Sequence, residues 1–81
     1  MESTNEVIYS KISYIVDYYM RERDFTIAQS HDYIRKTGII GMLKDTSTLL
    51  YLKPTNLLIG AINSYYKSNK EGMLRYLSNI D

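Results

Sequence analysis

A long apolar stripe in the first quarter of the chain constrains the fold more than any other feature. Over residues 4–23, apolar side chains recur every three or four positions, which is the period of one face of an α-helix. Ser3 and Glu6 have the spacing of a capping box at the start of such a helix. We therefore predict a helix over residues 4–23 that faces the core with Ile8, Ile12, Ile15, Val16 and Tyr19.

A second set of side chains lies on nearly the opposite side of the same predicted helix. It consists of Val7, Tyr14 and Tyr18, and we call it, together with the flanking Lys11 and Arg21, the tyrosine stripe. A helix that is apolar on two sides is usually buried on both, so one interpretation is that another helix covers this stripe. The other interpretation is a partner-binding surface, because Tyr and Arg are enriched at interface hot spots.

Capping signals divide the next part of the chain. Thr26 and Gln29 have the spacing of a second capping box, and Gly38 is a typical residue after a helix end. They predict a helix over residues 27–37 and then a short apolar helical segment over residues 39–43. The inward side chains of the first of these two are expected to be Ile27, Ser30, His31 and Ile34.

The second half of the chain is also predicted to be mainly helical. Residues 44–48 are polar and turn-like, and residues 48–53 fit either an extended segment or a helix end before Pro54. Helices are expected over residues 55–68 and 70–79, the last with Met73, Tyr76, Leu77 and Ile80 on one side. The predicted fold is all-α, a compact bundle of four to five short helices in a single domain over residues 1–81, with residues 69–81 as a C-terminal extension helix.

Composition excludes several classes of function. The 81 residues include no cysteine, which excludes disulfides and thiolate metal sites. The net charge is +1 with both signs interspersed, so a protein that relies on neutralising phosphates is not favoured. The chain has no apolar run long enough for a membrane span, and the polar N-terminal sequence is unlike a signal peptide. We expect a cytoplasmic protein, stabilised by oligomerisation or by a partner chain because a domain this short is marginally stable.

The sequence offers little for catalysis. His31 is the only histidine, and a single histidine on a helix is usually a packing or surface residue. No carboxylate pair has metal-binding spacing, and the four glycines are scattered rather than gathered in a phosphate-binding loop. We therefore predict a protein that is not an enzyme, with no catalytic residue, no cofactor, no metal and no small-molecule substrate.

A DNA-binding interpretation is the main alternative. Residues 27–48 can be drawn as a helix, a glycine turn and a recognition helix over residues 41–48. Base readout needs Arg, Gln or Asn on the exposed face of that helix, whereas Lys44 is its single basic residue. Binding to nucleic acid is therefore not favoured.

The order of apolar segments also resembles a known family. The matching features are Tyr18-Tyr19, the stretch AQSHDYIRKTG over residues 28–38, the apolar segments over residues 39–43 and 49–52, and a closing helix through Ile62 and Tyr66. In this pattern, residues 12–66 resemble a group of short bacterial helical proteins whose genes often lie beside genes for ADP-ribosyltransferase-like toxins. That group has no catalytic motif to carry over.

The leading functional prediction is a small non-enzymatic protein-binding module. It would act as an antitoxin-like or accessory subunit, through contact with another protein or through self-association. The alternatives are a helix-turn-helix-like DNA-binding regulator and a phage-encoded inhibitor of a host enzyme. The predicted contact residues are those of the tyrosine stripe.

Overall fold

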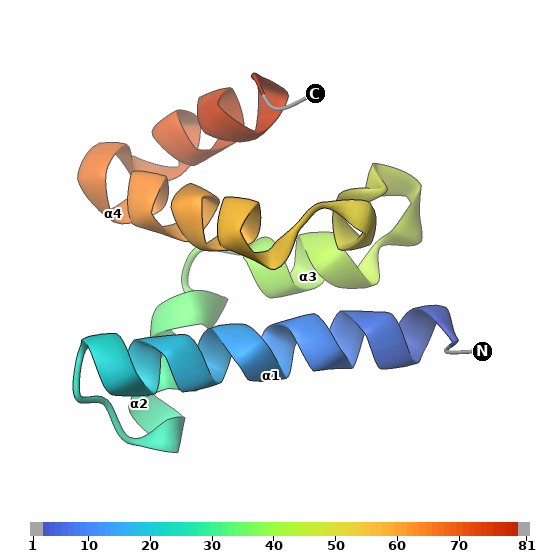
Figure 1. The fold of residues 1–81 in the computed structure, drawn as a ribbon. Coiled ribbons are helices and arrows are strands. Elements are labelled where there is room, and N and C mark those ends of the chain that lie inside the picture. The colour runs from blue at the N-terminus through green and yellow to red at the C-terminus, as the bar shows by residue number, and fades with distance from the viewer. Residues whose placement is uncertain (1–2, 80–81) are drawn as a thin grey trace.

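The computed structural model describes residues 3–79, and every regular element among them is helical. The α-helices are α1 (Thr4–Glu22), α2 (Ile27–Arg35), α3 (Ile39–Lys44) and α4 (Thr55–Ser78), and the single-turn 3-10 helices η1 (Thr46–Thr48) and η2 (Leu50–Leu52) connect α3 to α4. In Figure 1, α1 lies along one side of the bundle, and the C-terminal part of α4 lies farthest from it. The predicted all-α bundle is confirmed. Ile80, which was predicted to face inward, lies outside the described residues.

Helix α1 begins at the predicted cap. The backbone N–H of Glu6 donates to the Ser3 hydroxyl at 3.2 Å, which satisfies one of the donors that a helix start leaves unpaired. The whole predicted inner stripe is buried, namely Ile8, Ile12, Ile15, Val16 and Tyr19. The apolar period of α1 therefore identified its core face correctly.

The predicted start of α2 is also confirmed, whereas α2 ends at Arg35, two residues before the predicted end. The backbone N–H of Gln29 donates to the Thr26 hydroxyl at 3.1 Å, and the Thr26 N–H donates to the Gln29 side chain at 2.9 Å, which completes the capping box. After α2, Gly38 has a φ of 83°, a left-handed conformation that costs glycine little. This turn sends the chain directly into α3.

The predicted inner face of α2 was wrong at two of its four positions. Ser30 and Ile34 are buried, but Ile27 is 61% exposed and His31 is also exposed. The reason is the crossing with α1, where the Ser30 hydroxyl donates to the Val16 carbonyl at 2.7 Å. This close contact turns α2 so that Tyr33, rather than Ile27, packs toward the core.

Residues 44–48 form a turn, as predicted, whereas residues 48–53 adopt neither of the two conformations that the sequence allowed. Leu49 has a left-handed φ of 57° and separates the single turns η1 and η2, and Leu50 is buried in the core. The recognition helix that could be drawn over residues 41–48 in the DNA-binding alternative is not present as one helix, because α3 ends at Lys44. Two of the six residues of α3, Ile39 and Leu43, are fully buried.

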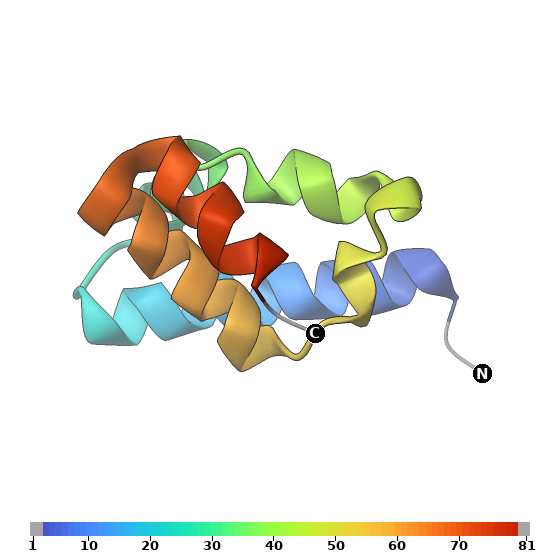
Figure 2. The ribbon, with the colours of Figure 1, turned by 90° about the horizontal axis from the view of Figure 1, so that it is seen from above.

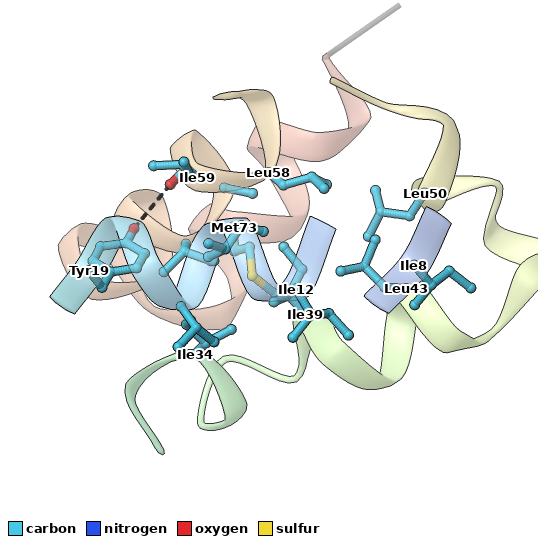
Figure 3. Close-up of a cluster of buried hydrophobic side chains, with 14 residues drawn as sticks. Ile8, Ile12, Tyr19, Ile34, Ile39, Leu43, Leu50, Leu58, Ile59 and Met73 are labelled. Carbon is cyan, nitrogen blue, oxygen red and sulfur yellow. Dashed lines mark hydrogen bonds between the residues drawn. The ribbon is translucent and has the colours of Figure 1, made fainter. Parts of the chain in front are cut away.

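Helix α4 folds back on itself where the sequence separated two helices. Ser68 and Asn69 have non-helical backbone angles, and they divide α4 into a first arm (residues 55–67) and a second arm (residues 70–78). Figure 2 shows the second arm running back along the first. Met73 of the second arm is 0% exposed and reaches toward Ile12 in the middle of the core (Figure 3).

Candidate functional site

An open groove of about 580 Å³ lies between α1 and the first arm of α4. Its α1 wall is formed by Tyr14 and Tyr18. Its α4 wall is formed by Thr55, Asn56, Ile59, Gly60 and Asn63. The groove therefore combines two aromatic rings with an apolar floor and a rim of amide and hydroxyl groups.

The two tyrosines differ in how firmly they are held. Tyr14 is 56% exposed, whereas Tyr18 is half-buried and meets the ring of Tyr19 edge-on, with the centroids 5.0 Å apart. Edge-on contacts between aromatic rings are favourable, so Tyr18 has a fixed place in the wall. Tyr14 is left as the accessible ring of the pair.

The floor of the groove depends on the second arm of α4. Gly60 has no side chain, and a Cβ at this position would overlap the hydroxyl of Tyr76. Tyr76 therefore packs behind the groove against the backbone of the first arm. Ile59, which is 8% exposed, supplies the apolar surface beside it.

A buried hydroxyl orients the amide at one end of the groove. The Tyr19 hydroxyl donates to Asn63 Oδ1 at 2.6 Å. It also lies 3.4 Å from the Ile59 carbonyl, a contact that Figure 3 marks with a dashed line. Because the amide oxygen of Asn63 already accepts the bond from Tyr19, its NH2 group keeps its two donors for a ligand. The core residue Tyr19 thus positions a polar group of the groove.

The Tyr19 hydroxyl also makes the free energy of unfolding depend on pH in the alkaline range. Burial raises the pKa of Tyr19, and the neighbouring Tyr33 adds to the shift. The folded protein keeps this proton where the unfolded chain loses it, so the stabilisation is complete below about pH 10 and is lost as the pH rises further. We expect the free energy of unfolding to fall by up to about 1.4 kcal/mol per pH unit above about pH 10.

Urea titrations at pH values from about 9 to 11.5 measure how the free energy of unfolding changes with pH. This range includes the ordinary tyrosine pKa. Tyr19→Phe has no hydroxyl to titrate and should lose this part of the pH dependence. An equal slope in Tyr19→Phe would assign the effect to other groups.

The tyrosine stripe is only partly gathered at this groove. Tyr14 and Tyr18 line it, while Val7 is half-buried outside it. The Lys11 ammonium donates to the backbone carbonyl of Lys53, and its partial burial lowers the pKa of Lys11. Lys11 therefore ties α1 to the segment that precedes α4.

Arg21 has a separate, local role at the end of α1. It is exposed and forms an ion pair with Asp17, with 3.3 Å between Nε and Oδ2. An exposed pair one helical turn apart contributes little stability. The structure thus joins Tyr14 and Tyr18 and places the other three stripe residues elsewhere.

Sequence reasoning missed an aromatic cluster that joins α2 to α4. Tyr33 of α2 stacks on Tyr66 of α4 at 4.0 Å between centroids, and the Tyr66 hydroxyl donates to the Tyr33 carbonyl at 2.6 Å. Tyr33 also contacts Tyr19 and Phe25, with centroids 5.0 and 5.2 Å away. The sequence contains nine tyrosines, which is a signal for aromatic contacts, but the apolar period of a helix does not show which rings of separate helices meet.

A second groove, of about 430 Å³, lies between α1 and α2. It contains the two residues of α2 that the sequence placed in the core, Ile27 and His31, together with Tyr9, Ile12, Ser13 and Val16. Tyr9 is 57% exposed, and the Lys44 ammonium lies 5.5 Å from the centre of its ring. This face is more apolar than the first groove and has fewer polar groups at its rim.

Comparisons with known proteins give no relative. No protein-family model, curated protein or solved structure matches the chain. Within residues 3–79, no three His, Asp or Glu side chains gather where they could hold a metal ion. The helices of the same range are too short or too polar to cross a membrane.

Proposed function

We propose that the protein is a small non-enzymatic protein-binding module, an antitoxin-like or accessory subunit, and that it binds its partner in the groove between α1 and α4. The observation that carries this proposal is the exposed ring of Tyr14 beside the fixed ring of Tyr18. A large amphipathic ring next to a preformed apolar floor is the arrangement typical of interface hot spots.

The lining of the groove favours a protein segment as the ligand. Side chains that hydrogen-bond occur on both sides of the apolar floor, with Thr55 and Asn56 toward one end and Asn63 toward the other. A peptide offers backbone N–H and C=O groups at regular intervals, so it can bond at both ends. Between those bonds, an aliphatic or aromatic anchor would fill the space over Ile59.

Truncating the exposed ring tests this proposal. Tyr14→Ala should weaken partner binding by about 2 kcal/mol, or roughly 30-fold in Kd, because hot-spot residues have effects of that size. The free energy of unfolding should change by less than about 0.5 kcal/mol, since Tyr14 is largely exposed. Affinity capture from native lysate with mass spectrometry identifies the partner, and calorimetry measures the Kd of each variant.

Tyr9→Ala is the matched control. Tyr9 lies on the same helix and is 57% exposed, against 56% for Tyr14, but it lines the other groove. A partner that Tyr14→Ala loses and Tyr9→Ala retains supports the proposal. A partner that binds both variants like the wild type would contradict it, and one that only Tyr9→Ala loses would move the site to the groove between α1 and α2.

A further inference from the structure

The turn inside α4 holds a residue in an unfavourable backbone conformation. Asn69 has φ 60° and ψ −169°, a region that glycine occupies readily and that residues with a Cβ rarely adopt. Its side chain partly compensates, since Asn69 Oδ1 accepts a hydrogen bond from the Glu71 N–H at 2.9 Å and caps the second arm. The two arms of α4 form a helical hairpin, and Asn69 is the strained residue at its hinge.

Gly72 shows that the hairpin is also sterically tight. A Cβ at this position would overlap the Cβ of Ser68 and would lie 3.4 Å from the Ser64 carbonyl. In a continuous helix, side chains four residues apart have Cβ atoms about 5–6 Å apart, so no such overlap exists. The requirement for glycine at position 72 thus comes from the folded-back form.

Straightening the hinge would remove both constraints. Residues 67–70 (KSNK) contain no proline, so their backbone can continue the helix from the first arm into the second. Asn69 would then have ordinary helical angles, and the first N–H groups of the second arm would regain intrahelical partners. A continuous α4 is therefore locally less strained than the hairpin.

What opposes straightening is the apolar face of the second arm. Met73 is fully buried against a core that includes Leu58, Ala61 and Ile62, each 0% exposed. If the second arm moves away from the first, the part of the core that Met73 covers, which we call the socket, is exposed to water. A second arm of the same sequence fills the socket with the same contacts, so a second copy of the chain is its natural occupant.

We propose that two copies of this protein exchange their second arms about Ser68–Asn69 and form a domain-swapped dimer with a continuous α4. A short strained hinge between the core and an arm that packs on it favours such exchange, because the dimer keeps all core contacts and releases the strain. The arm surface that carries Met73, Tyr76 and Leu77 is then the interface between the copies. The proposal rests on the hinge and on Gly72 rather than on the partner-binding groove, behind which Tyr76 would then come from the second copy.

Two substitutions at the hinge test the proposal in opposite directions. Asn69→Gly removes the strain of the hairpin and weakens a continuous helix, so it should favour the monomer. Asn69→Ala keeps the strain in the hairpin and favours the helix, so it should favour the dimer. Both variants lose the cap on Glu71, and their difference therefore isolates the backbone conformation. With two hinges in each dimer, we expect the dimer Kd of Asn69→Ala to be about 100-fold below that of Asn69→Gly.

Gly72→Ala gives a second test away from the hinge residue. It should lower the dimer Kd by about tenfold or more, because the added methyl group disfavours only the hairpin. Gly41→Ala is the control, since a Cβ at Gly41 has no neighbour within 4 Å and should leave the Kd unchanged. Sedimentation velocity over a concentration series measures the Kd of each variant.

An intrachain distance separates arm exchange from ordinary surface association. The chain has no cysteine, so spin labels on Asn56→Cys and Ser78→Cys report one distance along α4. In labelled chains diluted with unlabelled chains, this distance should lengthen on dimerisation to about 33 Å, the length of 22 residues of continuous helix. A dimer that keeps the short distance, or equal Kd values for Asn69→Ala and Asn69→Gly, would overturn the proposal, as would a monomer at all concentrations for both Asn69→Ala and Gly72→Ala.

Discussion

Replacing Tyr19 by alanine is expected to lower the free energy of unfolding by about 3–5 kcal/mol. Tyr19 is 1% exposed, and it joins α1 to α2 through the ring of Tyr33 and to α4 through Asn63. Alanine leaves a cavity where these three helices meet, which adds a cavity cost to the lost burial. At about 0.05–0.15 kcal/mol per residue, the total stability of a chain this long is only about 4–12 kcal/mol. Urea denaturation followed by circular dichroism measures the loss.

Two further variants separate the causes of this loss. Tyr19→Phe keeps the ring and removes only the hydroxyl, so it should cost about 1 kcal/mol. Tyr14→Ala removes an exposed ring from the same helix and should change stability by less than about 0.5 kcal/mol. A loss below about 1.5 kcal/mol for Tyr19→Ala, under the range for a buried aromatic residue, would contradict its central place in the core.

Replacing Met73 by alanine should lower the free energy of unfolding by about 2–5 kcal/mol. The side chain of Met73 is fully buried and reaches toward Ile12 of α1 (Figure 3). Because it fills the centre of the core from the second arm, the variant should lose stability as a whole. Amide hydrogen exchange should then show lower protection in α1 as well as in residues 70–78.

Leu74→Ala is the control for Met73→Ala. Leu74 is the next residue of the arm, but it is 44% exposed and should cost less than about 1 kcal/mol. If Met73→Ala reduced protection in residues 70–78 alone, the second arm would be a separate cooperative unit rather than part of one core.

Local sequence signals predicted the elements whose determinants are also local. Ser3, Thr26 and Gln29 cap helices through bonds to residues three positions away, and Gly38 supplies a left-handed turn at its own position. The 19 residues of α1 are long enough for an apolar period to define one face. The helical bundle and the core face of α1 could therefore be predicted from the sequence.

The short helix α2 shows why other features could not be predicted. In nine residues, two alternative faces have similar apolar content, and the contact of Ser30 with Val16 decides between them. That contact depends on how two helices cross, which no local pattern contains. The same limit explains why Ile27 and His31 were placed in the core.

The candidate site was predicted in part, for a related reason. The helical period of residues 4–23 correctly placed Tyr14 and Tyr18 on one side of α1, and both line the groove. The opposite wall comes from residues about forty positions later, where Asn63 is ordered by the hydroxyl of Tyr19. Lys11 shared the side of the two tyrosines, but its bond to the Lys53 carbonyl depends on the path of the chain before α4.

The position of Met73 has a consequence for biosynthesis. Translation produces α1, α2 and α3 before the second arm of α4, so the core of the nascent chain lacks Met73 until that arm has left the ribosome. The second arm thus sets when the core closes and, where two copies exchange arms, which chain closes it.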